Sequence, residues 1–176
     1  MKTNNIQNYL NSFGKQVVKE AKEGLKRKNK GGGPLELSIK FKLEPLKKGF
    51  SIQFFMLDYG AFVDKGVSGN KKIQEYKTWD GRIIESPYKY RSKQPPSGIL
   101  DKWVVKKGIA PRDKKGRFIE RKSLVFLIAR KIKRDGIKGI SFFQKPLSLG
   151  LNKFGKHLLL NVKEDIKSEL HNITIS

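Results

Sequence analysis

The stretch of sequence that decides the fold is Gly-Phe-Ser-Ile-Gln-Phe-Phe-Met-Leu-Asp-Tyr-Gly-Ala-Phe-Val-Asp-Lys-Gly-Val, residues 49–67. A strongly apolar strand runs here into a turn that contains aromatic residues and glycines. Tyr59, Phe62 and Val63 are too apolar to lie free in water, while Gly60 and Gly66 allow a positive φ or a close backbone approach. The turn therefore either docks on a partner surface or folds back onto the core of its own chain, and the spacing alone leaves both interpretations open.

A β-hairpin surrounds the start of this stretch. Apolar residues from Leu35 to Leu43 alternate with polar ones, and this period of two predicts a strand. Residues 45–49 supply a turn, and Phe50 to Leu57 form the second, antiparallel strand. We therefore expect a hairpin over residues 35–57.

Helical periodicity marks both ends of the chain. Apolar residues recur at three- and four-residue spacing from Ile6 to Ala21, which predicts an amphipathic helix. A long final helix is expected to open at Pro146, because proline is favoured in the first helical turn. Its apolar side carries Leu147, Leu151, Phe154, Leu158, Val162, Ile166 and Leu170. The tail, residues 171–176, is expected to be loose.

Shorter elements are predicted in the middle of the chain. Residues 68–94 are polar and irregular, so we expect a long loop with a tight turn at 79–82. A short helix capped by Ser97 should end at residues 106–108, and Asp113 to Gly116 read as a turn. A helix over 122–135, closed by Gly136, is expected to turn Leu124, Leu127, Ile128 and Ile132 inward.

These elements predict an α+β fold. A small antiparallel sheet, made of the hairpin and short strands, packs with the N-terminal helix and the long C-terminal helix. A chain of 176 residues is long enough for one well-buried domain. We therefore expect a single domain over residues 1–176, with an insertion at about 68–120 and a flexible basic connector at 26–34, where glycines and a proline stop the first helix.

The charge of the chain is strongly positive. It has 39 Lys and Arg against 16 Asp and Glu, a formal net charge of +23. This excess predicts a polyanionic partner, either nucleic acid or an acidic protein. Most of the charge is lysine, which binds phosphate without bidentate geometry, so base-specific recognition is not expected. The residues expected to face a polyanion, with simple solvation as the alternative, are Lys26, Arg27, Lys28, Lys30, Lys106 and Lys107.

Cysteine and long apolar segments are both absent from the sequence. The lack of cysteine excludes disulfides, thiolate metal sites and a cysteine nucleophile, and fits folding in a reducing cytoplasm. The N-terminus has no apolar core of signal-peptide length, and no run approaches the roughly 20 apolar residues that span a bilayer. We therefore expect a soluble protein with no membrane partner.

No catalytic, cofactor-binding or metal-binding residues are predicted. His157 and His171 lack a neighbouring acid that would orient a catalytic base, and no phosphate-binding glycine loop is present. One exception stays open: Asp58, Glu75 and Lys77 are similar to the Asp plus Glu-x-Lys arrangement of metal-dependent nucleases, in which two carboxylates hold Mg²⁺. That geometry needs Glu75 and Lys77 on a strand adjacent to Asp58, whereas the polarity of 68–77 favours a loop.

The order of the elements carries a resemblance to a known family. A helix and a hairpin are followed by Tyr59-Gly60-Ala61-Phe62-Val63-Asp64-Lys65-Gly66, and Phe142, Phe143 and Pro146 precede the last helix. This arrangement resembles the tail-completion or neck proteins of tailed bacteriophages, minor structural proteins of the head-to-tail joint. The chain departs from the family pattern at Gly60, Asp64 and Val67, where Ala, Glu and Thr are usual. The resemblance covers about two-thirds of the chain.

The resemblance implies a non-enzymatic virion protein that forms a homo-oligomeric ring in the neck, around the DNA channel. Its partners would be portal-side connector and tail proteins, with non-specific contact to packaged DNA, and it would assemble in the bacterial cytoplasm. The turn at 59–67 would dock against Phe142 and Phe143 of a neighbouring subunit. The expected subunit-interface residues are Tyr59, Phe62, Val63, Asp64, Gly66, Phe142, Phe143 and Pro146. A non-sequence-specific DNA-binding protein and the nuclease are the alternatives.

Overall fold

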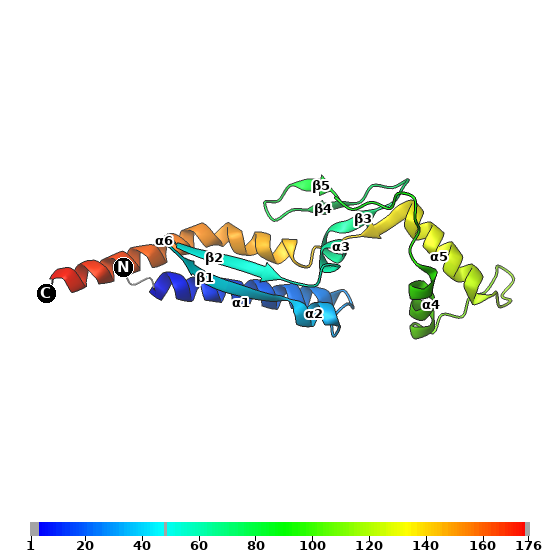
Figure 1. The fold of residues 1–176 in the computed structure, drawn as a ribbon, viewed down its shortest axis with the longest axis horizontal. Helices are drawn as coiled ribbons and strands as arrows, with labels where there is room; N and C mark the ends of the chain where they lie inside the picture. The colour runs from blue at the N-terminus through cyan, green and yellow to red at the C-terminus, as the bar shows by residue number, and fades with distance from the viewer. Residues whose placement is uncertain (1–3, 48, 175–176) are drawn as a thin grey trace. The chain divides into compact units, whose positions relative to one another are not determined.

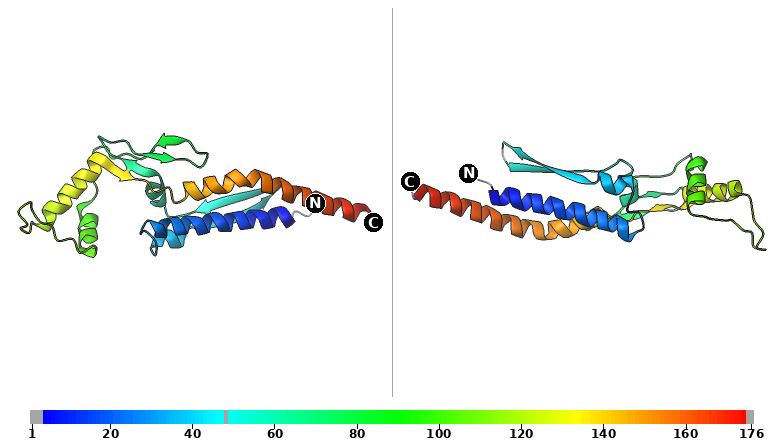
Figure 2. Two further views of the ribbon diagram at one scale, coloured as in Figure 1. Left: turned by 180° about the vertical axis from the view of Figure 1, so that it is seen from behind. Right: turned by 90° about the horizontal axis from the view of Figure 1, so that it is seen from below.

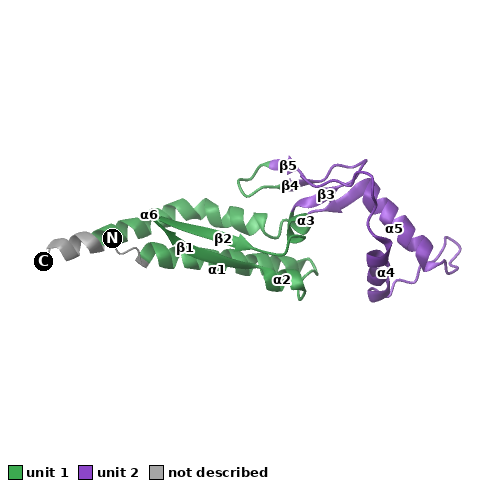
Figure 3. Cartoon of the chain, viewed as in Figure 1, with its two compact units in different colours: residues 1–64, 77–82, 140–176 green, residues 65–76, 83–139 purple. Residues whose placement is uncertain are grey.

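The computed structural model describes the backbone of residues 4–47 and 49–174, and the side chains of 5–47 and 49–167. The chain divides into two compact units, coloured separately in Figure 3. Unit 1 comprises residues 1–64, 77–82 and 140–176, and unit 2 comprises residues 65–76 and 83–139. Unit 2 holds most of the stretch expected as an insertion and extends beyond it to Gly139.

Unit 1 is built on two long helices, α1 (Asn4–Arg27) and α6 (Gln144–Thr174). Figures 1 and 2 show them side by side and antiparallel. Both were predicted from their apolar spacing. Residues 171–174 continue α6, so the expectation of a loose tail is wrong for them, and residues 175–176 lie outside the described residues. The described helices contain no apolar segment long enough to cross a bilayer.

The predicted first strand begins later than expected. Residues Pro34–Ser38 form a short helix, α2, and strand β1 covers Lys40–Leu46. Leu35 and Ile39 are buried while Leu37 is 79% exposed. This is the i, i+4 spacing of a helix, which apolar alternation over so few residues can imitate. Pro34 suits the first helical turn, and the Ser38 hydroxyl donates to the Leu35 carbonyl at 2.7 Å.

The β-hairpin itself is confirmed. β1 pairs antiparallel with β2 (Gly49–Phe55), with Phe41 opposite Phe54 and Leu43 opposite Ile52. The turn between the two strands is shorter than expected, because β1 continues through Pro45 to Leu46. Lys48, part of the expected turn, lies outside the described residues.

One buried cluster forms the core of unit 1. It collects one face of α1, Leu35 of α2 with Ile39 directly after it, and the aromatic pair that precedes α6. Its members are Phe13, Val17, Ala21, Leu25, Leu35, Ile39, Phe142 and Phe143. The hairpin adds Ile52 and Phe54, and α6 adds Leu147, Leu151 and Phe154. Burial of this continuous apolar surface is the main force that stabilises unit 1.

The expected aromatic turn is a short helix. Residues Gly60–Lys65 form α3, and Gly66–Ser68 form strand β3. Within unit 2, β3 pairs antiparallel with β6 (Gly136–Lys138), so that Ser68 lies opposite Gly136. The intervening chain of unit 2 therefore leaves from one strand of this pair and returns to the other.

Residues 68–94 are more regular than the predicted loop. β4 (Glu75–Lys77) and β5 (Ile83–Glu85) form a two-stranded sheet. The predicted tight turn between them is confirmed, because the Thr78 amide donates to the Arg82 carbonyl at 2.8 Å and Gly81 has a φ of 90°. Short strands of this kind carry little apolar periodicity, which is why the sequence favoured a loop.

Two helices complete unit 2. α4 (Ser97–Lys106) packs on α5 (Arg121–Asp135), with Val104, Val125 and Ala129 buried. Ser97 makes no capping hydrogen bond, because Pro96 occupies the cap position. Of the residues expected inward on α5, Leu124, Ile128 and Ile132 are partly buried, but Leu127 is 55% exposed. The most buried positions of α5 are Val125 and Ala129, which were not predicted. The α+β fold, with its terminal helices and small antiparallel sheets, is confirmed.

Candidate interaction sites

Asp64 ties α3 to the start of α6 within unit 1. Its side chain is 1% exposed, and Oδ1 accepts hydrogen bonds from the backbone amides of Phe143 at 2.8 Å and Gln144 at 3.4 Å. The carboxylate thus lies at the positive end of the α6 dipole and satisfies amides that the helix leaves unpaired. The Asp64 and Val63 carbonyls accept from the amides of Ser141 and Ile140. We call this connection the Asp64 latch.

The latch buries part of the expected subunit interface inside one chain. Phe142 is 2% exposed and Phe143 is 9% exposed, and Pro146 is also buried. The Phe143 ring packs edge-on against Phe54, with 5.4 Å between ring centroids. Phe142 and Phe143 are therefore covered by the core of their own chain, rather than forming a surface for the turn of a neighbour.

Other members of the expected interface are exposed. Tyr59 and Phe62 each expose 44% of their surface, whereas Val63 is partly buried against the core. α3 lies close to the core at Gly60: a Cβ at this position would approach the Met56 Sδ to 2.7 Å and the Leu35 Cδ1 to 2.8 Å, so a larger residue would require these side chains to move. Gly66, another expected interface residue, is buried in β3.

The basic residues at the end of α1 are partly neutralised. The Lys26 Nζ lies 3.2 Å from a Glu36 carboxylate oxygen, and the Gly32 amide donates to the same carboxylate at 2.6 Å. The hydrogen bond from Gly32, together with the Lys26 ammonium, holds the pKa of Glu36 below its ordinary value. Arg27 and Lys28 are exposed and line a cleft of about 620 Å³ with residues at the start of α6.

The other expected polyanion-facing residues are also exposed. Lys30 follows α1, and Lys106 and Lys107 lie at the C-terminal end of α4. Cations at this end of a helix are favoured by the dipole, so their position has a structural explanation of its own. The structure thus leaves these residues accessible without grouping them into a cavity.

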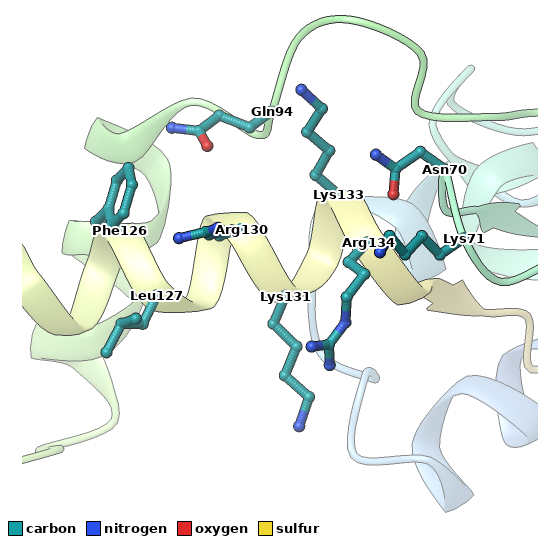
Figure 4. A pocket seen from close by; sticks show the side chains of 9 residues that line it. All are labelled: Asn70, Lys71, Gln94, Phe126, Leu127, Arg130, Lys131, Lys133 and Arg134. Atoms are coloured by element: carbon teal, nitrogen blue, oxygen red, sulfur yellow. The ribbon is translucent and has the colours of Figure 1, made fainter.

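A larger basic cavity, not predicted from the sequence, lies in unit 2. It has a volume of about 730 Å³, and we call it the basic hollow. Figure 4 shows its lining side chains along α5 and on the segments that carry Asn70 and Gln94. They are Asn70, Lys71, Gln94, Phe126, Leu127, Arg130, Lys131, Lys133 and Arg134. The sequence shows the run of cations at the end of α5, but it does not show that Lys71 lies near them in the fold.

Two of the possible nuclease residues, Glu75 and Lys77, lie on a strand, which that kind of site requires although the sequence favoured a loop. β4 carries Glu75 and Lys77, both exposed, with Tyr76 buried between them, so alternation places the two polar side chains on one face. The expectation of a loop at these two residues was therefore wrong. Among the described residues, no group of three or more His, Cys, Asp or Glu side chains is arranged to hold a metal ion.

The chain was compared with known proteins in three ways. No family model matches it, and neither the curated proteins nor the solved structures contain a significant match. The function is therefore argued from the residues and geometry described above.

Proposed function

We propose that this protein is a non-enzymatic structural component of a tailed-phage virion. In this proposal it forms a homo-oligomeric ring in the neck, between the portal-side connector and the tail, with DNA passing through the centre. It assembles in the cytoplasm of the bacterial host and needs no cofactor. The exposed α3 surface, formed by Tyr59 and Phe62, contacts an adjacent subunit.

The observation that carries the proposal is the Asp64 latch. It joins two sequence segments on which the resemblance to neck proteins rests, the 59–66 motif and the aromatic-proline segment before the last helix. Asp64 Oδ1 binds the amide of Phe143 across 79 residues of sequence. The latch fixes α3 on a rigid support, while two of its aromatic neighbours stay exposed. A rigid base with projecting aromatic side chains suits a protein interface, where such residues are enriched.

The net charge supports a location next to a polyanion. Every copy in a ring carries the same excess of positive charge, +23, so identical neighbours repel one another. Phosphate groups of DNA or acidic virion proteins would offset that repulsion. The same charge also favours the second candidate, a free DNA-binding protein, which would bind duplex DNA as a monomer without forming a ring.

The proposal is tested by replacing Phe62 with aspartate in the phage that encodes the protein. A charge in the centre of an apolar contact weakens it strongly, so we expect incorporation of the F62D variant into particles to fall at least about tenfold. The matched control is Phe118→Asp, because Phe118 is a 68% exposed aromatic residue of unit 2. Circular dichroism checks that both variants remain folded.

Two results would contradict the proposal. Normal incorporation of folded F62D shows that α3 does not contact a subunit. Equal loss for F62D and the Phe118 control shows that any added surface charge blocks assembly, which removes the specific role of α3. Tight binding of wild type to DNA as a monomer, with no ring formed with any virion protein, would favour the free DNA-binding protein.

A further inference from the structure

The positive charge is concentrated in unit 2. Its 69 residues carry 20 basic and 6 acidic side chains, a formal net charge of +14, whereas the 107 residues of unit 1 carry 19 and 10, a net charge of +9. Six of the eight arginines belong to unit 2. Unit 2 therefore has more than twice the charge density of unit 1, and counter-charge is needed most there.

Half of the carboxylates of unit 2 are already engaged with arginines. The distance from the arginine Nε to an aspartate Oδ atom is 2.6 Å for Arg121 and Asp101, 3.0 Å for Arg117 and Asp113, and 2.7 Å for Arg134 and Asp135. Across the described part of the chain, no carboxylate pairs with Lys71, Arg130 or Lys131 in the basic hollow. All three cations are exposed to solvent, and Lys131 is attracted by the Asp135 carboxylate, which is already paired with Arg134.

The basic hollow is held together by hydrogen bonds between three segments. The amides of Asn70 and Lys71 donate to the carbonyls of Lys133 and Arg134 at the end of α5, at 2.9 and 3.0 Å. The Lys133 Nζ donates to the Ser92 carbonyl at 2.6 Å. These bonds fix the segments that carry Lys71 and Gln94 against α5. The cations are thus presented on a supported surface rather than on an unattached loop.

The dipole of α5 explains only some of these charges. Lysine and arginine are favoured in the last turns of a helix. Lys71, however, belongs to a different segment, and its own amide already occupies a terminal carbonyl of α5. Figure 4 shows Lys71 beside Arg134, Arg130 further along the helix, and the amides of Asn70 and Gln94 along the same lining. Cations from two segments, α5 and the segment of Lys71, thus line one hollow, which indicates a binding surface for an anion.

We propose that the basic hollow binds the sugar-phosphate backbone of duplex DNA, with Lys71, Arg130 and Lys131 as its phosphate contacts. This inference rests on the proposed function, which places DNA next to the protein. A second copy of the chain cannot supply the counter-charge, because both units are positive. Duplex DNA offers one phosphate charge per roughly 1.7 Å of its axis, and binding releases condensed counterions. A contact of this kind is independent of base sequence, because phosphate groups carry no sequence information.

The test measures the affinity of the full-length protein for a DNA duplex over about 50 to 200 mM salt. The triple variant K71Q/R130Q/K131Q removes three charges from the hollow. The matched control K102Q/K114Q/K115Q removes three exposed charges elsewhere in unit 2. We expect the hollow variant to bind at least about tenfold more weakly than the control, and its salt dependence to be shallower by about two to three in log–log slope.

Several results would overturn the inference. If the hollow and control variants bind DNA with equal affinity, binding depends on overall charge and not on the hollow. If the wild-type protein does not bind DNA, the hollow is not a DNA-binding site. Poly-glutamate serves as the probe for an acidic protein: if it binds the hollow as tightly as DNA of equal charge, the assignment to DNA is wrong.

The same variants separate this inference from the proposed function. Loss of DNA affinity in the hollow variant, with normal incorporation of F62D, supports the hollow and contradicts the ring contact. Unchanged DNA affinity in the hollow variant, with loss of F62D from particles, contradicts the hollow and leaves the proposed function standing.

Discussion

Unit 1 and unit 2 are stabilised in different ways. All eight members of the buried cluster belong to unit 1, where two long helices pack with a hairpin of two seven-residue strands. Unit 2 has strands of three residues, and its buried apolar side chains are Tyr76, Val104, Val125 and Ala129. The comparison teaches that apolar burial and net charge are separated along this chain: one part provides the stable support, and the other carries most of the unbalanced charge.

Polar contacts replace apolar burial in unit 2. The Ser68 backbone exchanges two hydrogen bonds with the segment at 88–90, donating to the Tyr88 carbonyl at 2.7 Å and accepting from the Tyr90 amide at 2.8 Å. The Ser86 hydroxyl donates to the Gly66 carbonyl at 2.6 Å, and the Gln74 side-chain amide donates to the Asp135 carbonyl. A unit organised by such bonds can tolerate many exposed cations, because little of its stability depends on a large apolar core.

The largest difference is expected between two phenylalanines. Phe142→Ala should lower the free energy of unfolding by about 3 to 5 kcal/mol, because the ring is 2% exposed and its removal leaves a cavity. Phe126→Ala in unit 2 should change it by less than about 0.5 kcal/mol, since that ring is 52% exposed. Urea unfolding of both variants measures the two values. Similar losses would show that the contrast between the units is false.

The Asp64 latch should have the next largest effect. Asp64→Ala is expected to cost about 2 to 3 kcal/mol, because the buried amide of Phe143 loses a charged acceptor. Asp64→Asn keeps an acceptor oxygen and should cost about half as much. Thermal unfolding compares the two variants. An unchanged free energy of unfolding in Asp64→Ala would show that the latch does not stabilise unit 1.

Gly136 allows unit 2 to be destabilised while unit 1 is left unchanged. Gly136 has a φ of 77°, and a Cβ there would overlap the Val67 carbonyl oxygen and lie 2.6 Å from the Gly69 amide nitrogen. Gly136→Ala should therefore destabilise the β3–β6 pair by about 1 to 3 kcal/mol. Hydrogen exchange should show faster exchange at β3 and β6 and unchanged protection in α1. If α1 loses as much protection from hydrogen exchange as β3 and β6, the two units are not stabilised separately.

The smallest expected effect is the pH dependence of Glu36. Its pKa is lowered in the folded protein, so its contribution to stability is fully present above its unfolded pKa of about 4.3 and is lost as the pH falls through the lower folded value. The difference in stability between wild type and Glu36→Gln should be constant near neutral pH and should vanish in strong acid. A difference that grows on acidification would contradict the role of the Gly32 and Lys26 contacts.

The sequence predicted the elements whose apolar spacing extends over several turns. The helix from Ile6 to Ala21 and the final helix have such spacing, and both are present. The same approach failed at Leu35 to Ile39, because five residues fit both periods, and at Leu127, because Val125 and Ala129 are the buried positions of α5. Short patterns are decided by tertiary packing, which local spacing does not contain.

The polar contacts of the candidate sites were less accessible to prediction. Asp64 was selected from the motif as an interface residue, yet its acceptor role depends on a segment 79 residues away. Asp165 similarly accepts from the amides of Asn5 and Ile6 at the start of α1, with nothing in its local sequence to mark it. The basic hollow depends on Lys71 meeting the end of α5. Single carboxylates and lysines have no periodic signal, so their partners appear only in the fold.

The central claim is that the exposed α3 surface of unit 1 joins subunits while unit 2 meets DNA. The most direct test of this proposal is electron cryomicroscopy of the phage particles proposed to contain this chain, with a reconstruction of their neck. The account predicts a closed ring of copies in which Phe62 contacts an adjacent subunit and the basic hollow faces the DNA. Particles that lack the chain, or a ring in which α3 faces solvent, would contradict it.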